Sequence, residues 1–329
     1  MQPILPRSYV ARHVTTPPVI DGKLDGPAWA NAPWTADFVD IEGPAKPKPR
    51  FRTRAKLLWD DAFLYIAAEL EEPHLWGKLT QHDAVIFQDP DFEVFLDPDG
   101  DTHDYFEFEI NALNTGWDLM LPKPYMDGGK ARNEWEIPGL KTAVHLRGTL
   151  NRPDDTDHGW TLELAFPWSA FSTAGRPAGP PAEGAEWRIN FSRVEWLVTV
   201  SENKYVKVPK TPEDNWVWSP QGVIDMHRPE QWGRVLFTRQ PPSAPVALPS
   251  LPGKAARDLV LDYYYAQLDF FKTHRRWAGT FSELGWSAPR GLTIDFRPSP
   301  DGYEFSASFA EGARRRAWTI RQDRRLTLE

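Results

Sequence analysis

Short apolar runs separated by turn residues are the feature that most limits what this chain can fold into. In DYFEFEIN (104–111), Phe106, Phe108 and Ile110 alternate with polar residues, so one face of the strand is apolar and the other is polar. Similar runs are AKLLWD, FLYIAAEL, FEVFLD, GWDLML, WTLELAF, WRINFSRV and GRVLF. Many short strands without intervening helices predict an antiparallel β-sandwich, of the immunoglobulin-like or jelly-roll type, rather than a parallel βαβ sheet.

A proline-rich segment divides the chain. Residues 239–253 contain five prolines and no periodic apolar pattern, which is typical of an extended linker. After it, ARDLVLDYYYAQLDFFKTHRRW has the apolar period of a helix and lacks Pro and Gly, and the remaining residues predict short antiparallel strands. We therefore expect a β-sandwich domain over 1–238 and a small α+β unit, a long helix plus an antiparallel meander, over 254–329.

Composition excludes several classes of protein. The chain has no cysteine, so disulfides, thiolate metal sites and cysteine nucleophiles are excluded. No apolar stretch approaches the roughly 18 residues of a membrane span. Residues 254–329 contain 13 Lys+Arg against 10 Asp+Glu, which leaves 25 against 36 in the larger part. Because an acidic domain repels a phosphate backbone, we expect no nucleic-acid partner.

The start of the chain, MQPILPRSYVARHV, has neither the charged nor the apolar region of a signal peptide. An extracytoplasmic location, periplasmic or secreted, is therefore expected only if a native leader has been removed.

Tryptophan is the compositional outlier, with 16 residues in the chain, 13 of them before residue 254. In EDNWVWSPQG (213–222), Trp216 and Trp218 are two positions apart, so in an extended segment their rings share one face. That flat aromatic surface either packs in a core or stacks on a ligand, and both interpretations stay open from these residues alone.

Four segments, in order, give the chain a family resemblance. They are VIDGKLDGPAW (19–29), DPDFEVFLDPDGDTHDYFEFEIN (89–111), WTLELAFPW with EWRINFSRVEW (160–168 and 186–196), and NWVWSPQGVIDMHRPEQWGRVLF (215–237). Together they make residues of about 15–238 resemble carbohydrate-binding modules of family 9. The resemblance implies a β-sandwich that binds a saccharide or polysaccharide between aromatic side chains and contains structural calcium.

The resemblance also implies a set of ligand-binding residues. Glu93 matches a glutamate that accepts hydrogen bonds from sugar hydroxyls. Six positions earlier, Phe87 replaces the tryptophan that forms one stacking plate, and Trp76 or Trp117 is the substitute for this smaller ring. The second plate corresponds to Trp218, with Trp216 beside it. The expected ligand-binding residues are Trp218, Trp216, Glu93, Phe87, Glu109, Asn111 and Trp117. A pyranose has an apolar C–H face and a rim of hydroxyls, which suits aromatic rings bordered by carboxylate and amide groups.

The loop DPDGDTHD (97–104) is rich in oxygen ligands. Asp97, Asp99 and Asp101 are the candidate ligands for the structural Ca²⁺ that the resemblance implies, since calcium prefers oxygen donors. Asp and Gly are also the commonest turn formers, so a plain hairpin loop is the other interpretation.

Two alternatives to simple binding remain. Glu93, Glu107, Glu109 and Glu163 would be the candidate carboxylates of a glycoside hydrolase, which needs two of them across a cleft. Haem would require Met120, Met126 or Met226 with His145 or His227. Because no GxSxG, HExxH, P-loop or GxGxxG motif is present, we expect a non-catalytic carbohydrate-binding protein.

Overall fold

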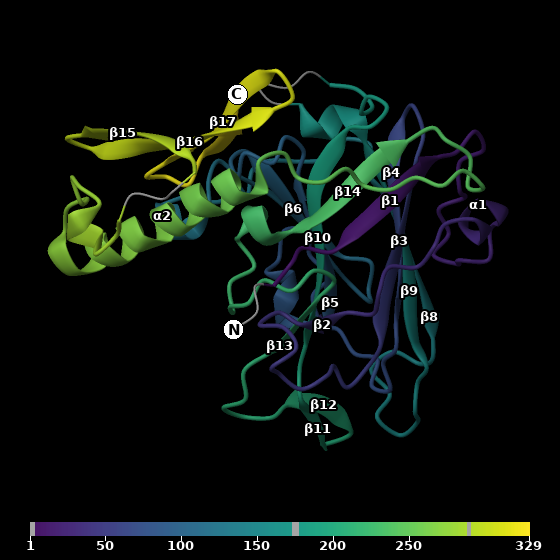
Figure 1. Cartoon of the computed structure of the whole chain (residues 1–329). Coiled ribbons are helices and arrows are strands. Elements are labelled where there is room, and N and C mark those ends of the chain that lie inside the picture. Colours follow the sequence, from purple (N-terminus) through teal and green to yellow (C-terminus); the bar gives the residue numbers. More distant parts are fainter. Residues whose placement is uncertain (1–3, 173–177, 288–290) are drawn as a thin grey trace. The chain divides into compact units, whose positions relative to one another are not determined.

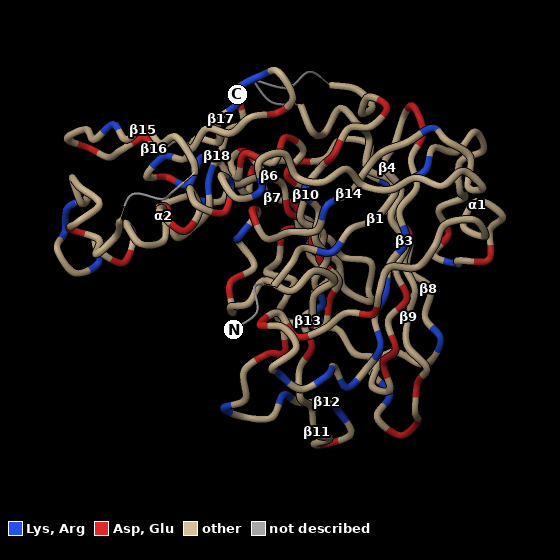
Figure 2. The backbone as a smooth tube through the Cα atoms, in the orientation of Figure 1, with Lys and Arg blue, Asp and Glu red and all other residues tan. Residues whose placement is uncertain are grey.

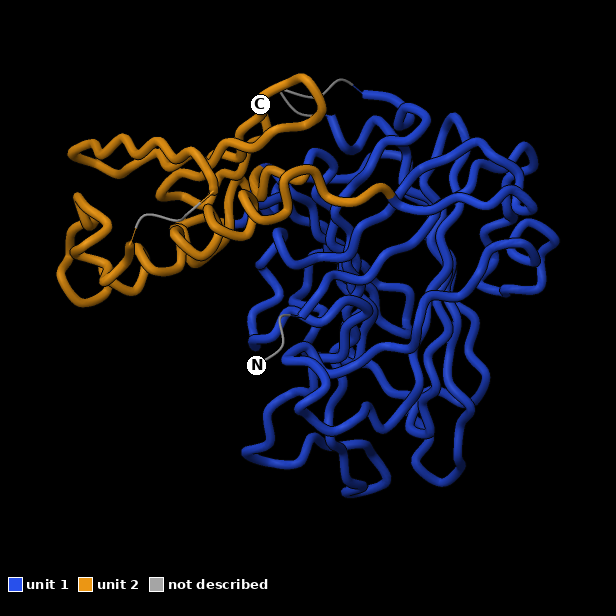
Figure 3. The backbone as a smooth tube through the Cα atoms, in the orientation of Figure 1, with its two compact units in different colours: residues 1–99, 104–121, 131–248 blue, residues 100–103, 122–130, 249–329 orange. Residues whose placement is uncertain are grey.

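The computed structural model describes residues 4–172, 178–287 and 291–329 (Figure 1). The chain divides into two compact units (Figure 3), the first of residues 1–99, 104–121 and 131–248, the second of residues 100–103, 122–130 and 249–329. The division at 248/249 falls inside the proline-rich segment. The domain limits 1–238 and 254–329 stay a prediction, and the two short segments before residue 131 that belong to the second unit have no signal in the sequence.

Within the described residues, the first unit is built on a twelve-stranded sheet. The strand order is β7-β6-β5-β10-β14-β1-β3-β4-β9-β8, with β13 paired to β10 and β2 paired to β13. The strands are β1 (Ser8–His13), β2 (Val39–Asp40), β3 (Thr53–Trp59), β4 (Phe63–Leu70), β5 (Asp91–Asp97), β6 (Tyr105–Asn111), β7 (Gly116–Leu121), β8 (Lys141–Arg147), β9 (Gly159–Pro167), β10 (Glu186–Glu195), β13 (Asp214–Val217) and β14 (Gly233–Thr238). A separate hairpin is formed by β11 (Val198–Ser201) and β12 (Lys204–Lys207).

The mainly β prediction is confirmed, but the sheet is mixed rather than antiparallel. β1 runs parallel to β14, with Tyr9 opposite Val235, and parallel to β3, with Arg12 opposite Leu58. The sheet curls so that its two ends face each other, and Phe108 of β6 contacts Phe166 of β9 with ring centroids 5.6 Å apart. A curled sheet and a sandwich bury the same alternate residues, so the strand pattern does not distinguish them.

Aromatic side chains fill the space enclosed by the curled sheet. Six tryptophans lie in this core: Trp59, Trp160, Trp168, Trp187, Trp216 and Trp218. Because each aromatic side chain buries roughly 150–250 Å², much of the tryptophan excess is explained by packing. Short helical segments connect the strands: α1 (Pro27–Ala30) and the 3-10 helices η1 (Ile86–Gln88), η3 (Trp168–Phe171) and η4 (Pro229–Gln231).

The second unit has the helix and meander predicted for it. Helix α2 (Lys254–His274) packs on an antiparallel sheet of order β15 (Thr293–Ser299), β16 (Gly302–Glu311), β17 (Arg314–Arg321) and β18 (Leu326–Leu328). Tyr263 of α2 lies against Phe305 of β16 with ring centroids 4.1 Å apart. Two 3-10 helices, η2 (Tyr125–Asp127) and η5 (Ser282–Leu284), complete the unit. Among the residues that the structure describes, no helix combines the length and apolarity needed to cross a membrane.

Candidate functional site

Acidic side chains of β5 and β6 share one face of the sheet. Glu93 lies opposite Glu109, and Asp91 lies opposite Asn111. The alternate residues of β5 point into the aromatic core, so these polar groups point to the other face. Figure 2, which marks Asp and Glu in red, shows acidic positions along β6. The structure therefore brings together Glu93, Glu109 and Asn111, as predicted.

A loop covers this acidic face. Glu93, Glu109 and Asn111 are only 6%, 2% and 0% exposed. The Phe87 backbone N–H donates to Glu109 Oε2 at 2.9 Å, and the Asn111 amide donates to the Leu79 carbonyl at 2.9 Å. Phe87 is half-buried at the edge of this loop. The predicted polar floor is thus present but closed.

Burial changes the acidity of these carboxyl groups. It raises the pKa of Glu93 to about 7. Burial, followed by repulsion from Glu93, also holds the pKa values of Asp91, Glu107 and Glu109 well above the usual range. Asp91, Glu93 and Glu109 each offer an oxygen, and these three atoms lie within 4.8 Å of one another. Carboxyl groups clustered in this way stay partly protonated up to neutral pH, or else share another cation.

The two tryptophans of the WVW stretch point the other way. Trp216 and Trp218 are 3% and 1% exposed and belong to the aromatic core. Trp218 packs on Phe191, with ring centroids 5.8 Å apart, and on Tyr9 at 6.5 Å. Since Phe191 alternates with Ser192, which pairs with Glu93, the sheet separates Trp218 from the acidic face. As these rings lie, neither presents a face to a ligand, so we expect both to act in core packing.

Trp117 of β7 lies directly opposite Glu109, so the structure brings this predicted residue to the acidic face as well. Its ring is half-buried against a second aromatic cluster, around Trp232. Asp97 is buried at the end of β5, Asp99 is exposed, and Asp101 belongs to the second unit, so the calcium site stays a prediction.

The carboxylates considered for hydrolysis are all buried, at 6% exposure or less: Glu93, Glu107, Glu109 and Glu163. Glu163 has a structural role, since it accepts hydrogen bonds from Trp29 Nε1 at 2.6 Å and from the Gly22 N–H at 2.8 Å. Of the methionines considered for haem, Met120 lies in the core, Met226 packs against the Trp232 cluster, and Met126 is in the second unit.

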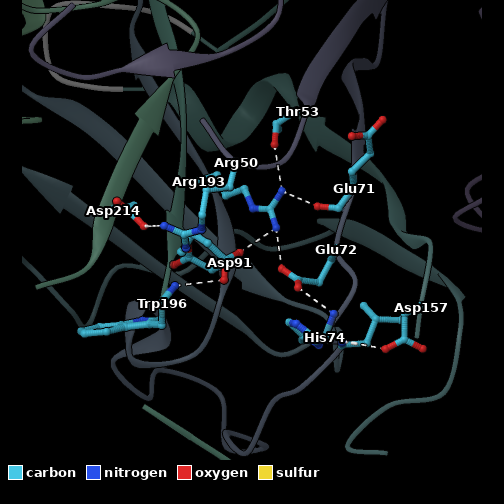
Figure 4. A network of polar contacts seen from close by, with 12 residues as sticks. Arg50, Thr53, Glu71, Glu72, His74, Asp91, Asp157, Arg193, Trp196 and Asp214 are labelled. Carbon is cyan, nitrogen blue, oxygen red and sulfur yellow. Dashed lines mark hydrogen bonds and ion pairs between the residues drawn. The ribbon is translucent and has the colours of Figure 1, made fainter. Parts of the chain in front are cut away.

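A buried arginine organises a second polar region of the first unit (Figure 4). Arg193 Nη2 donates to Glu72 Oε2 and to Glu195 Oε2, each at 2.6 Å. Its Nη1 donates to Thr53 Oγ1 at 3.1 Å and to the Glu71 carbonyl at 2.8 Å. Burial, and next the Glu195 carboxylate, hold the pKa of Glu72 well above its usual value. One guanidinium thus ties β10 to the loop that follows β4.

Two tryptophans follow these anchored glutamates closely. Trp76 lies four residues after Glu72, and Trp196 directly follows Glu195. Lys207 Nζ, at the end of β12, lies 3.2 Å from the Trp196 ring centroid and 5.9 Å from that of Trp76. The two centroids are therefore at most 9.1 Å apart, the sum of those distances. Trp196 is half-buried, Trp76 is buried, and burial lowers the pKa of Lys207 to about 8.

Hydrogen bonds fix the Trp196 indole and the backbone that precedes Trp76. Trp196 Nε1 donates to the Phe87 carbonyl at 2.9 Å, next to the loop that covers the acidic face. The Leu75 N–H donates to Asp157 Oδ2 at 2.8 Å, which fixes the segment before Trp76 (Figure 4). A ring held in this way needs little ordering when a ligand binds.

A charged cavity of about 650 Å³ lies beside the same loop. Its lining residues are Phe51, Arg52, Glu69, Glu71, Glu72, Pro73, Arg147, Asp157 and His158. The volume is within the roughly 300–1,000 Å³ of small-molecule sites. Glu71 and Glu72, which accept hydrogen bonds from Arg193, are part of this lining, so the Arg193 network forms part of the cavity wall.

The sequence contained only part of the signal for this region. Trp196 ends EWRINFSRVEW, a segment that carries the family resemblance, and Trp76 was considered as a substitute plate. Glu72 lies 121 residues before Arg193 in the sequence, and only the fold brings it to Arg193 and Glu195. Lys207 had no signal, because nothing in β12 predicts that its hairpin reaches Trp196.

Comparisons with known proteins agree with the sequence resemblance. A family model described as "Carbohydrate family 9 binding domain-like" matches residues 20–193. The exoglucanase XynX of Acetivibrio thermocellus is 24% identical over 165 residues, which are 50% of this chain and 13% of that protein. The chain thus spans only a small part of that relative.

One solved structure resembles the chain in fold, and a second is reported for its sequence coverage. A putative carbohydrate-binding protein from Bacteroides uniformis matches with a TM-score of 0.51 and 16% identity, covering 70% of this chain and 99% of that one. A family 9 carbohydrate-binding module from Caldicellulosiruptor kristjanssonii, in complex with cellotriose, has a TM-score of 0.47 and 19% identity, covering 74% and 100%. Because the family model covers more than half of the 329 residues, the chain belongs to the carbohydrate family 9 binding domain-like family.

Proposed function

We propose that the first unit binds a saccharide on the half-buried Trp196 ring, without cleaving it. One observation carries this proposal: the Lys207 ammonium lies on this ring, 3.2 Å from its centroid, so the indole face is covered only by a side chain that a ligand can displace. A pyranose stacked on one ring lies about 3.5–4.0 Å from it, which is close to the present distance of the ammonium from the Trp196 centroid.

In this proposal, the Lys207 ammonium of the free protein occupies the position on the Trp196 ring that the sugar takes in the complex. An ammonium on an indole face gains a cation–π attraction, and a pyranose gains contact between its C–H groups and the same face. The ligand displaces the ammonium from the ring. Gln88 Oε1, which lies 3.4 Å from Lys207 Nζ, then becomes an acceptor for a sugar hydroxyl at the rim.

Binding without turnover is the chemistry that the carboxylates support. Hydrolysis needs an acid and a second carboxylate on opposite sides of the scissile bond. Glu93, Glu107 and Glu109 share one covered face, and Glu163 is bonded to Trp29 and the Gly22 backbone. We therefore expect no release of reducing sugar during incubation with a bound oligosaccharide.

The test is titration of the full chain with glucose and with cellotriose, followed by tryptophan fluorescence and calorimetry. Trp196→Ala should lose about 1–3 kcal/mol of binding, by analogy with base–aromatic stacking. Trp34→Ala is the matched control, because Trp34 is also half-buried beneath a cation, with Arg54 Cζ 4.1 Å from its centroid. Unchanged affinity in Trp196→Ala would contradict the proposal.

The cavity beside Glu72 is the competing location. Its Phe51 ring and charged lining also suit a sugar. If Arg147→Ala abolishes binding while Trp196→Ala leaves it intact, the saccharide occupies the cavity rather than the Trp196 ring.

We propose that the loop of residues 97–104 binds a structural Ca²⁺, because its sequence is rich in oxygen ligands. Asp97, Asp99 and Asp101 supply the carboxylates. A rise in melting temperature with CaCl₂, lost in Asp99→Asn, would support it, whereas no response to calcium would refute it.

We also propose an extracytoplasmic location for the native protein, since polysaccharide ligands are found outside the cytoplasm. Cell fractionation with an antibody against the chain tests it, and a purely cytoplasmic signal would refute it.

A further inference from the structure

Three carboxylates of the first unit surround one imidazole nitrogen. His82 Nε2 lies 3.2 Å from Glu136 Oε2, 3.4 Å from Asp83 Oδ1 and 3.4 Å from Asp118 Oδ1. Asp118 is on β7, His82 and Asp83 are on the loop before η1, and Glu136 precedes β8. This His82 cluster thus joins three separate segments of the chain.

The other imidazole nitrogen fixes the ring. His82 Nδ1 lies 2.9 Å from the Gly116 carbonyl oxygen, which can only accept a hydrogen bond. Nδ1 therefore carries a proton, and in the neutral imidazole Nε2 presents its lone pair to the carboxylates. A backbone carbonyl that orients the second nitrogen is the usual arrangement of a histidine metal ligand.

A buried oxygen of Asp118 points into the cluster. Asp118 is 2% exposed, and its Oδ2 accepts a hydrogen bond from the Ile137 N–H at 2.7 Å. Its Oδ1, at 3.4 Å from His82 Nε2, has no hydrogen-bond partner among the residues that the structure describes, and the same holds for Asp83 Oδ1. Two buried anionic oxygens facing a lone pair require a cation between them.

A proton meets this requirement only in part. Burial acts to lower the pKa of His82, but the Glu136 hydrogen bond and the charges of Asp83 and Asp118 raise it overall. A protonated Nε2 has one N–H, which serves one acceptor well, whereas three carboxylate oxygens lie at nearly equal distances from it. A divalent ion can bond to His82, Asp83 and Asp118 at once, since their ligand atoms lie within 4.8 Å of one another.

We propose that His82 Nε2, Asp83 Oδ1 and Asp118 Oδ1 bind a divalent transition-metal ion such as Zn²⁺, because ligand atoms of these three residues lie within 4.8 Å of one another. With bonds of about 2.0–2.2 Å, neighbouring ligand atoms of a tetrahedral zinc site lie about 3.3–3.5 Å apart. The contacts of His82 Nε2, at 3.2–3.4 Å, have that spacing. An imidazole ligand favours zinc, nickel or cobalt over calcium, which prefers oxygen donors alone.

The bound ion would tie the covering loop to the sheet. His82 and Asp83 lie between Trp76 and Phe87 on the chain, and Asp118 is fixed in β7. The inference does not depend on saccharide binding, because its ligands are separate from Trp196 and Lys207.

The test uses Co²⁺ as a spectroscopic probe of the chelator-stripped full chain at pH 7.5. We expect one equivalent of Co²⁺ to give the visible absorption of a tetrahedral site, and Zn²⁺ to displace it. His82→Ala and Asp118→Asn should abolish the spectrum. Asp83→Asn, at a 32% exposed side chain, should keep the fold and weaken Co²⁺ binding by at least about tenfold.

His274→Ala is the matched control. His274 Nδ1 also lies near a backbone carbonyl, that of Phe270 at 3.0 Å, but no ion pair joins its ring to a carboxylate among the described residues. This variant should bind Co²⁺ like the parent chain. The proposal is overturned if the parent shows no Co²⁺ spectrum, if Asp83→Asn and His82→Ala bind unchanged, or if equimolar Ca²⁺ displaces Co²⁺.

Discussion

Glu72 and Glu195 accept hydrogen bonds from the same atom, Nη2 of Arg193, each at 2.6 Å. Both carboxylates and the guanidinium are at most 3% exposed. Glu195 directly precedes Trp196, and Glu72 starts the segment that leads to Trp76. The spacing of the two indoles therefore depends on one buried cation.

Removing that cation should destabilise the first unit. Arg193→Met leaves two buried carboxylates without a guanidinium, and breaking a buried pair in this way costs about 3–5 kcal/mol. Glu72→Gln should cost less, because burial already holds the pKa of Glu72 well above its usual value and favours the neutral form. Urea unfolding measures both. Arg152→Ala, which removes an exposed pair with Asp154, is the control and should change stability little.

An Arg193→Met protein as stable as the parent would show that the network is dispensable. In that case the positions of Trp76 and Trp196 would have to be set by the Phe87 and Asp157 hydrogen bonds instead.

Trp218→Ala separates core packing from ligand stacking. Truncating a core tryptophan leaves a cavity that costs roughly 3–5 kcal/mol, so we expect a large fall in melting temperature. A Cβ at Gly233 would lie 2.3 Å from the Trp218 ring, so Gly233→Ala should also destabilise the unit. Trp196→Ala, at a half-buried ring, should affect affinity more than stability. A stable Trp218→Ala protein with lost saccharide binding would restore the stacking role of the WVW stretch.

Much of the fold could be predicted because its signals are local. The alternation of apolar and polar residues in β6 and the apolar period of α2 are each visible in one short stretch of consecutive residues. Both elements form as expected. The parallel insertion of β1 between β14 and β3 pairs Ser8 with Arg234, more than 200 positions away, and Arg12 with Leu58, 46 positions away, and no local pattern specifies such pairings.

The candidate site was harder to predict for a related reason. The i, i+2 rule correctly places Trp216 and Trp218 on one face, but it does not say whether that face is the core. The Trp76 and Trp196 pair depends on a shared arginine and on the β11–β12 hairpin, which are contacts between distant segments.

The buried acidic face should make stability depend on pH. The pKa of Glu93 in the folded chain is about 7, above its ordinary value of 4.5. Between these values the folded state binds more protons than the unfolded state, so the free energy of unfolding falls as pH rises. We expect stability to decrease from pH 5 to pH 8, and Asp91, Glu107 and Glu109 contribute with the same sign.

Glu93→Gln should flatten this profile, because an amide does not ionise. The share of Glu93 is up to roughly 3 kcal/mol, from about 1.4 kcal/mol per pKa unit. Chemical unfolding at several pH values measures it, with the exposed Glu134→Gln as control. A Glu93→Gln profile as steep as that of the parent would assign the slope to other groups.

The proline-rich segment should be the first site of proteolysis, but only in its second half. Arg12 donates to the carbonyls of Gln240, Pro241 and Ala244, at 3.0, 2.6 and 2.8 Å, which holds the first half against β1. We expect limited proteolysis to cut between 245 and 253, and mass spectrometry identifies the site. Arg12→Ala should extend the cuts toward 240. Early cuts within the strands of the first unit would contradict this.

Lys207 should make saccharide binding depend on pH. Burial lowers its pKa to about 8 in the free protein. If the sugar displaces the side chain into water, the pKa returns to about 10.4. Binding then takes up a proton between these values, so affinity should fall as pH rises from 8 to 10, by at most about tenfold per pH unit. Calorimetric titrations with cellotriose at several pH values measure this.

Lys207→Gln should remove the dependence, because its side chain does not titrate. Lys204→Gln, on the same strand but exposed, is the matched control and should keep it. An affinity that stays constant from pH 8 to 10 in the parent chain would mean that the ammonium remains on the Trp196 ring in the complex. The saccharide would then have to bind elsewhere, and the cavity lined by Phe51 and Arg147 would be the next location to test.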